Sequence, residues 1–139
     1  MDRAIVHFDG ASVLARGRYI GGWGFTVEAP SIHREEFGHL DLAESGATNN
    51  VAEYTAAVRS LEYLVQAGYH GPVEVYGDSQ LVVRQFTGEY RVRAEHLRPY
   101  HERLQALGRS FESVRFVWIP REENQRADTL SKQGLSGEG

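Results

Sequence analysis

Hydrophobic residues at the start of the chain form an almost unbroken run. Residues 4–8 have the apolar composition of a strand that is buried on both faces of a sheet, and we expect Asp9 at its carboxyl end. Two further stretches, 21–27 and 35–42, predict strands on either side of Pro30. Together these segments predict a three-stranded antiparallel meander.

The pattern changes to a helical period after residue 50. Apolar residues recur at alternating spacings of three and four, which is typical of one helix face packed on a sheet. They are Val51, Tyr54, Val58, Leu61 and Val65. Gly68 is expected to end this helix, because glycine readily adopts the left-handed conformation of a helix end.

Strands and helices alternate in the remainder of the chain. Short apolar runs at 73–76 and 114–118 predict two strands, with one or two helices between them and a final helix after Pro120. Trp23 and Trp118 are expected in the core. The whole pattern predicts an α/β fold with a five-stranded mixed sheet, three antiparallel strands then two parallel ones, flanked by helices.

The length and composition favour one domain, residues 1–139. The chain has no cysteine, which excludes disulfides, thiolate zinc sites and a cysteine nucleophile. Its first residues lack the basic start and long apolar run of a signal peptide, and no run approaches membrane-spanning length. We therefore expect a cytoplasmic monomer.

The net charge of −4 argues against binding nucleic acid by bulk charge alone, but the charges are unevenly distributed. One stretch gathers Arg84, Arg91, Arg93, Arg98 and Arg103 around His96 and His101. Glu89, Glu95 and Glu102 lie among them. The stretch fits either a phosphate-binding patch or a salt-bridged, solvated helix face.

Four acids, each in its own motif, are the candidate chemistry of the chain: Asp9, Glu53, Asp78 and Asp128. Mg²⁺ takes oxygen ligands, usually with only one or two carboxylates per ion, so four acids suit two ions. Two strand ends and two helices could bring them together, because open α/β sheets bind ligands beyond the carboxyl ends of their strands. The set predicts two-metal phosphodiester chemistry.

Each acid also has a simpler interpretation when taken alone. Asp9 before a glycine could be turn chemistry, and Asp78 could cap a helix. Glu53, three residues after an asparagine, could form a reciprocal helix cap, and Asp128 could be a solvated acid on a terminal helix. Only the combination of all four indicates a site.

These residues resemble the type-1 ribonuclease H family, which cleaves the RNA strand of RNA–DNA hybrids. The resemblance covers residues 4–133 and implies the ribonuclease H fold. It rests on Phe8-Asp9-Gly10-Ala11-Ser12 followed by Gly21-Gly22-Trp23-Gly24, on Thr48-Asn49-Asn50-x-x-Glu53, on Gly77-Asp78-Ser79-Gln80 and on Asn124-x-x-Ala127-Asp128.

The resemblance implies that the four acids bind two Mg²⁺ ions, for which Mn²⁺ can substitute, with Asp9 bridging them. The ions would activate a water and stabilise the leaving 3′-oxygen, giving 5′-phosphate and 3′-hydroxyl ends. Without metal, clustered carboxylates repel one another and some of their pKa values should rise.

The resemblance also implies substrate contacts. Asn49, Asn50 and Gln80 match positions that approach the minor groove, where 2′-hydroxyls distinguish RNA from DNA. Thr48 matches a position that holds a DNA phosphate, and Ser12 belongs to the first motif. Taken alone, the asparagines fit turn and cap chemistry better than a substrate contact, and the threonine better fits a helix N-cap.

Two departures from the family pattern stand out. The loop before Asp128 is short and lacks the histidine of many members, so Arg121 is a candidate for part of its role; the alternative is an arginine paired with nearby acids. The extended basic protrusion is also absent, which leaves the arginine-rich stretch, with Tyr90, Arg91 and Arg93, to contact substrate. This is the pattern of the short-loop branch without the protrusion.

Three other functions stay open from the sequence. A non-cleaving nucleic-acid-binding module could keep the fold, although it has no need for four repelling carboxylates. A nuclease of broader specificity could also cut double-stranded RNA. A domain that only scaffolds partners would require the four motifs to coincide by chance.

Overall fold

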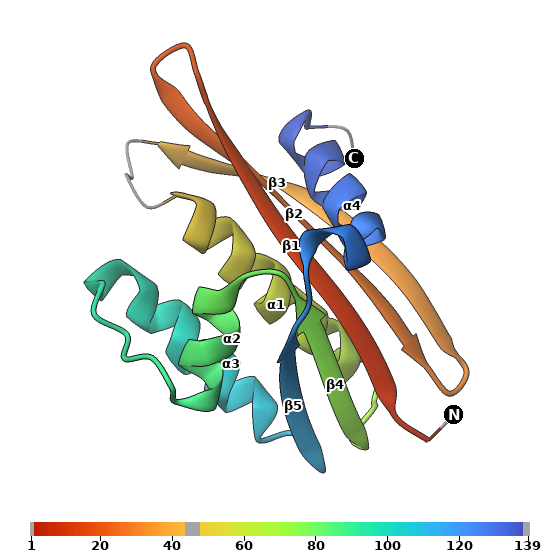
Figure 1. Ribbon diagram of the computed structural model, residues 1–139. Helices are drawn as coiled ribbons and strands as arrows, with labels where there is room; N and C mark the ends of the chain where they lie inside the picture. The colour runs from red at the N-terminus through yellow and green to blue at the C-terminus, as the bar shows by residue number, and fades with distance from the viewer. Residues whose placement is uncertain (1, 44–47, 138–139) are drawn as a thin grey trace.

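Five strands form one sheet in the computed structural model, which describes residues 2–43 and 48–137. The strands are β1 (Ala4–Ala15), β2 (Arg18–Ala29), β3 (Ile32–Ala43), β4 (Pro72–Gly77) and β5 (Ser113–Trp118). Their order is β3-β2-β1-β4-β5 (Figure 1). The first three strands pair antiparallel, and β4 and β5 run parallel to β1, which confirms the predicted mixed sheet.

Within the described ranges, four α-helices and two short 3-10 helices connect and cover the strands. They are α1 (Thr48–Gln66), α2 (Gln80–Thr87), η1 (Glu95–Leu97), α3 (Arg98–Gly108), η2 (Arg121–Glu123) and α4 (Gln125–Leu135). Gly68 has φ of +79° just beyond α1, as expected for a residue that ends a helix. No helix in the described ranges is long and apolar enough to cross a bilayer.

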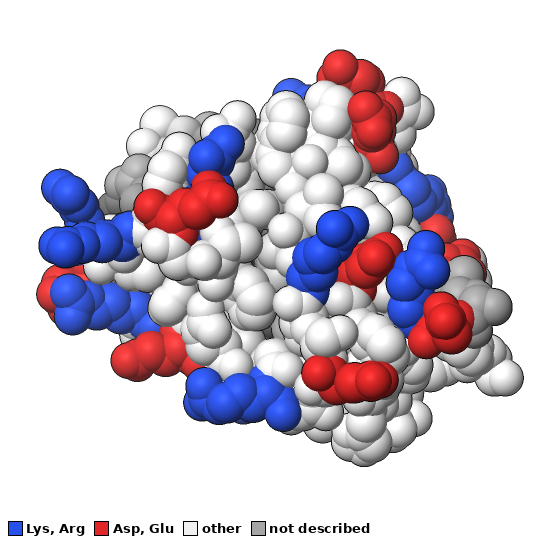
Figure 2. Space-filling model, turned by 60° about the horizontal axis from the view of Figure 1, so that its bottom comes forward, with Lys and Arg blue, Asp and Glu red and all other residues white. Residues whose placement is uncertain are grey.

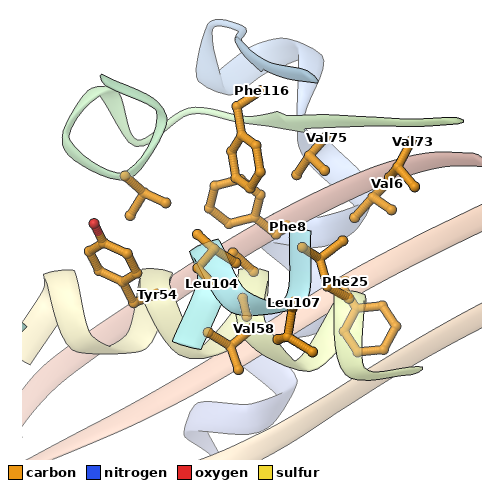
Figure 3. Close-up of a cluster of buried hydrophobic side chains, with 14 of the residues drawn as sticks. Val6, Phe8, Phe25, Tyr54, Val58, Val73, Val75, Leu104, Leu107 and Phe116 are labelled. Atoms are coloured by element: carbon orange, nitrogen blue, oxygen red, sulfur yellow. The ribbon is translucent and has the colours of Figure 1, made fainter. Parts of the chain in front are cut away.

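The main core lies between the sheet and helices α1, α2 and α3, because alternate strand residues point to that face. Phe8 of β1 and Phe25 of β2 are fully buried there, and Phe116 of β5 contacts Phe8 with ring centroids 6.2 Å apart. Figure 3 shows these rings among the buried aliphatic side chains. The labelled neighbours are Val6, Tyr54, Val58, Val73, Val75, Leu104 and Leu107.

The opposite face of β1, β2 and β3 is covered by α4 at very short range. Gly22 and Gly24 of β2 alternate with the core residues of that strand and therefore face α4. A Cβ on Gly22 would lie 2.1 Å from the carbonyl oxygen of Ser131, and a Cβ on Gly24 would lie 2.5 Å from the Cβ of Leu130. Only glycine permits this approach, which fixes the position of α4 on the sheet.

Two details differ from the sequence prediction. β1 does not end at Asp9 but continues to Ala15, because its pairing with β2 extends through the hairpin. The core position expected for Trp118 is also wrong, since its side chain is 42% exposed. Trp118 is the last residue of the edge strand β5, and its indole Nε1 donates to the backbone oxygen of Asp78 at 3.2 Å.

Candidate active site

Three carboxylates converge where β4 ends beside β1. The parallel pairing of these strands ends at Phe8 and Gly77. The next residues, Asp9 and Asp78, therefore lie just beyond the last pair between β1 and β4. Glu53 reaches the same place from α1. The carboxylate oxygens of the three acids lie within 4.8 Å of one another. The predicted convergence of these acids is therefore observed.

Glu53 reaches this position because α1 touches β1 at Gly10. A Cβ on Gly10 would lie 2.3 Å from the backbone nitrogen of Glu53, so no other residue fits without moving the helix. The Gly10 amide donates a hydrogen bond to Glu53 Oε1. The Glu53 carboxylate, only 5% exposed, thus bonds to β1 rather than to its own helix. Asp9-Gly10 lies within that strand and not in a turn.

The interpretation of Asp78 as a helix cap does not hold either, because another residue caps the helix. Ser79 is the N-cap of α2, and its side chain accepts a hydrogen bond from the backbone nitrogen of Val82 at 3.2 Å. The Asp78 carboxylate is not needed to start the helix. It is therefore left for the acidic cluster.

Asp128, the fourth acid, lies in the first turn of α4 and lines the same cavity. Its Oδ2 is 3.1 Å from Lys132 Nζ, and its Oδ1 is 3.5 Å from Arg121 Nη2. The pairing of Arg121 with a nearby acid, expected as one alternative, is thus present. Asp128 and Arg121 both line the cavity, so the pairing also holds Arg121 beside the acids.

Two of the four acids have raised pKa values, as expected for the cluster without metal, but burial is a larger cause than repulsion. Burial raises the pKa of Asp9 to about 7, and the charge of Asp78 adds to the rise. Burial also raises the pKa of Glu53 well above its usual value, with the charges of Asp9 and Asp78 acting in the same direction. Burial alone would raise the pKa of Asp128, but hydrogen bonds from Lys132 and Asp9, and the charges of Lys132 and Arg121, lower it.

These pKa shifts predict how the stability of the metal-free protein depends on pH. Asp9 and Glu53 hold protons more tightly in the folded than in the unfolded state, so the free energy of unfolding should fall as pH rises from about 4 to about 7. Asp9→Asn should flatten this fall and stabilise the protein by about 2 kcal/mol at pH 8. Urea unfolding in chelator across this pH range measures both effects.

The control for this pH series is Asp2→Asn, which removes an exposed acid outside the site and should keep the wild-type slope. Mg²⁺ should reduce the slope in the wild type, since the cation replaces the bound protons. An Asp9→Asn protein with the wild-type pH slope would contradict the assignment of the fall to this cluster.

An open cavity of about 410 Å³ lies over the acids. Besides the four acids, its lining includes three residues expected at the site or substrate, namely Ser12, Asn49 and Arg121. The lining is completed by Gly10, Ala11, Val13, Lys132 and Leu135. Most of the lining side chains are charged or polar, which suits a charged substrate rather than an apolar ligand.

The other expected substrate residues lie outside this cavity. Asn50 is in the first turn of α1, directly after Asn49, and Gln80 is the first residue of α2, two positions after Asp78. Tyr90 and Arg91 line a second cavity of about 420 Å³ between α2 and α3, and Arg93 lines neither cavity. Thr48 is the first residue of α1, but its side chain lies outside the described part of the structure.

The arginine-rich stretch is largely ion-paired. Arg84 pairs with Glu89 at 3.0 Å, and Arg98 with Glu95 at 3.5 Å. Within residues 2–43 and 48–137, no acid pairs with Arg91 or Arg93. Figure 2 shows basic and acidic side chains interspersed over one face of the molecule. The solvated-face interpretation therefore accounts for part of the stretch, and these two arginines are left for other contacts.

Sequence reasoning missed two residues of the site. Ser131 donates to Asp9 Oδ2 at 3.1 Å, and Lys132 pairs with Asp128 as described above. Both follow Asp128 by one helical turn, at spacings of three and four. That spacing was the available signal, because residues three and four apart share one helix face.

The residues present fit divalent cations. All four candidate ligands are carboxylates, which are hard oxygen donors of the kind that Mg²⁺ and Mn²⁺ prefer. Three are close enough to share an ion, and burial together with neighbouring negative charge raises the pKa values of Asp9 and Glu53. The charges of these two acids are therefore not fully compensated within the protein itself. A bound cation would supply that compensation.

Comparisons with known proteins agree with this geometry. A family model described as reverse transcriptase-like matches residues 8–134. The ribonuclease HI of Halobacterium salinarum is 34% identical over 96% of this chain, and the chain spans 64% of that protein. The ribonuclease H of Thiobacillus denitrificans is 32% identical, covering 96% of this chain and 94% of that protein. The chain spans 35% of a bifunctional protein of Mycobacterium tuberculosis.

Solved structures show the same relationship. The crystal structure of the Halobacterium salinarum RNase H1 superposes with a TM-score of 0.80, covering 96% of this chain and 98% of that chain. LC11-RNase H1, solved in complex with an RNA/DNA hybrid, has a TM-score of 0.80 at 33% identity and covers 96% of each chain. By sequence, fold and site geometry, the chain belongs to the type-1 ribonuclease H family.

Proposed function

We propose that this protein is a metal-dependent endoribonuclease that hydrolyses the RNA strand of RNA–DNA hybrids by a two-metal-ion mechanism. The observation that carries the proposal is the convergence of Asp9, Glu53 and Asp78 within 4.8 Å in an open cavity of a ribonuclease H-family chain. The hybrid in the LC11-RNase H1 complex supports this class of substrate. A scaffold without a site would not need buried acids that repel one another.

The four acids would hold two Mg²⁺ ions, or Mn²⁺ in their place. Bound ions would supply an activated water and stabilise the charge on the leaving 3′-oxygen, so that the products carry 5′-phosphate and 3′-hydroxyl ends. Asp9 is the proposed bridging ligand, because its carboxylate lies close to Glu53 and Asp78 and also accepts a hydrogen bond from Ser131 of α4. Asp128, whose carboxylate is paired with the side chains of Arg121 and Lys132, would be the fourth ligand.

Substrate selection would come from residues around the cavity. Asn49 and Ser12 line it, and Asn50 and Gln80 follow the lining residues Asn49 and Asp78 by one and two positions. Their polar side chains are proposed to contact 2′-hydroxyls in the minor groove. Thr48 is proposed to hold a phosphate of the DNA strand. These contacts would distinguish the hybrid from double-stranded DNA.

The second surface, formed by Tyr90, Arg91 and Arg93, would contact the duplex away from the acids. Two of these residues line the cavity between α2 and α3, and the arginines are free of ion pairs among the described residues. Each phosphate that they neutralise should steepen the slope of log binding constant against log salt concentration by about 0.7–0.9. The cytoplasmic location and monomeric state expected from the sequence stay predictions.

The proposed function is tested with labelled RNA–DNA hybrid, double-stranded RNA and double-stranded DNA, each with Mg²⁺, Mn²⁺ or chelator. We expect metal-dependent cutting of the RNA strand of the hybrid only. Cutting of double-stranded RNA as well would keep the site and widen the specificity. If the protein binds the hybrid but cleaves nothing with either metal, the result would favour a binding module over an enzyme.

Arg121 is the proposed substitute for the missing loop histidine. Arg121→Ala should lower kcat by about tenfold, with less effect on KM for the hybrid, because a charged hydrogen-bonding group would be lost beside the reacting phosphate. Single-turnover kinetics separates the effect on the cleavage step from the effect on hybrid binding.

Arg126→Ala provides the matched control for the arginine substitution. Arg126 lies nearby in α4 but pairs with Glu35 of β3 at 2.7 Å and does not line the cavity. It should keep the wild-type kcat. An unchanged kcat in Arg121→Ala would show that its pairing with Asp128 has no role in turnover.

A further inference from the structure

Ser131 is a fully buried hydroxyl between α4 and the acidic cluster. Its relative exposure is 0%, and its Oγ lies 3.1 Å from Asp9 Oδ2 and 2.8 Å from the backbone oxygen of Asp128. We propose that Ser131 is a positioning residue that fixes the Asp9 carboxylate for metal binding. This inference rests on the proposed function, and it adds a residue that none of the family motifs contains.

The contact depends on how closely α4 approaches the sheet. Gly24 is the β2 residue directly paired with Asp9, and a Cβ there would lie 2.7 Å from the backbone nitrogen of Ser131. The helix backbone therefore sits against the strand pair at the level of Asp9. At this range a side chain as short as serine reaches the carboxylate.

Ser131 differs from the other side chains that bond to Asp9. Those others, Glu53 and Asp128, are themselves proposed metal ligands. The serine hydroxyl is a hydrogen-bond donor and is not a proposed ligand, so it can hold the Asp9 carboxylate without occupying a position on an ion.

A hydroxyl that donates to a carboxylate forms a charge-assisted bond, which is stronger than a bond between neutral groups. Such a bond restricts rotation of the Asp9 carboxyl group about its side-chain torsion. Outer groups that orient metal ligands in this way typically contribute about 10- to 100-fold to metal affinity or activity. Ser131 should therefore act on metal binding and turnover rather than on binding of the hybrid.

Ser60 provides a matched control within the same chain. It is also 0% exposed, it lies in a helix, and its Oγ donates to the backbone oxygen three residues earlier, Ala57, at 2.7 Å. Ser131 has the same kind of contact with the Asp128 backbone oxygen, but its single hydroxyl proton is shared between that oxygen at 2.8 Å and Asp9 Oδ2 at 3.1 Å. Ser60→Ala and Ser131→Ala therefore both remove a hydroxyl that contacts the helix backbone. The two variants differ in the contact with Asp9.

The experiment compares the wild type, Ser131→Ala and Ser60→Ala by Mn²⁺ and Mg²⁺ titration followed through the metal-dependent rise in Tm, and by hybrid cleavage kinetics. Ser131→Ala should weaken metal binding about tenfold and lower kcat about tenfold, while KM stays close to the wild-type value. Both variants should change the Tm of the metal-free protein by similar amounts. Ser131→Cys, which keeps the volume and a weak donor, should lie between Ser131→Ala and the wild type.

Metal binding by Ser131→Ala within twofold of the wild type, or an equal loss in Ser60→Ala, would overturn the positioning role. If Ser131→Ala does not fold, Ser131→Cys decides by the same comparison. A wild type that binds Mn²⁺ but cleaves nothing would refute the proposed function alone, and metal titration would still decide the role of Ser131. A wild type that binds neither metal would refute both.

Discussion

Asp78→Asn will abolish hybrid cleavage and leave the protein folded. The substitution removes one carboxylate from the three that lie within 4.8 Å, and with it a ligand for the proposed ions. Ions at such sites contribute several kcal/mol of charge stabilisation, so the rate should fall by about 10³-fold or more. Cleavage of labelled hybrid under single-turnover conditions measures the loss.

The fold should tolerate this change because the structural contacts of residue 78 do not use its carboxylate. The backbone oxygen of Asp78 accepts from Trp118 Nε1, and asparagine keeps that oxygen. The charge of Asp78 also raises the pKa values of Asp9 and Glu53, so its removal relieves repulsion in the metal-free protein. The metal-free variant should be as stable as the wild type or more stable.

Ser79→Ala gives the reverse pattern and is therefore the matched control. It removes the N-cap of α2 and should cost about 1 kcal/mol of stability, while all four acids stay in place. Cleavage should then continue at temperatures below its Tm. An active Asp78→Asn protein, or a Ser79→Ala protein that is folded but inactive, would contradict the assignment of activity to the carboxylates.

Much of the fold follows from local pattern. The run at residues 4–8 and the helical period after residue 50 each appear in the structure as expected, as β1 and α1. The meeting of Asp9 and Asp78 was also predictable, because parallel strands end at the same edge of a sheet. These features depend on hydrophobic periodicity and strand direction, which a single sequence carries.

The remaining features depend on distances between elements, which periodicity does not encode. The contact between Ser131 and Asp9 joins residues 122 positions apart and requires the register of α4 on β2. Trp118 looked like a core residue because its strand is apolar, but β5 is an edge strand and ends there. Alternation along a strand cannot show which strand is at an edge.

The close packing of α4 on the sheet predicts a large stability effect for one added methyl group. Gly22→Ala places a Cβ 2.1 Å from the carbonyl oxygen of Ser131 and 2.4 Å from the backbone nitrogen of Leu135. Backbone atoms cannot move aside as side chains do, so α4 must shift away from the sheet. We expect a loss of about 3 kcal/mol in the free energy of unfolding, measured by urea unfolding in chelator.

Gly108→Ala is the control for the added methyl group. A Cβ on Gly108 would lie 3.4 Å from the Phe86 ring, an ordinary contact, and alanine is favoured over glycine in a helix. Its stability should equal or exceed that of the wild type by up to about 1 kcal/mol. A Gly22→Ala protein as stable as the wild type would show that α4 is not held at this distance.

The same displacement should reach the active site. Because α4 carries both Asp128 and Ser131, moving it away from Gly22 also moves a proposed metal ligand and the hydroxyl that contacts Asp9. Gly22→Ala should therefore weaken Mn²⁺ binding even at temperatures where the protein is fully folded, whereas Gly108→Ala should not. Loss of stability without loss of metal binding would separate the packing of α4 from the geometry of the site.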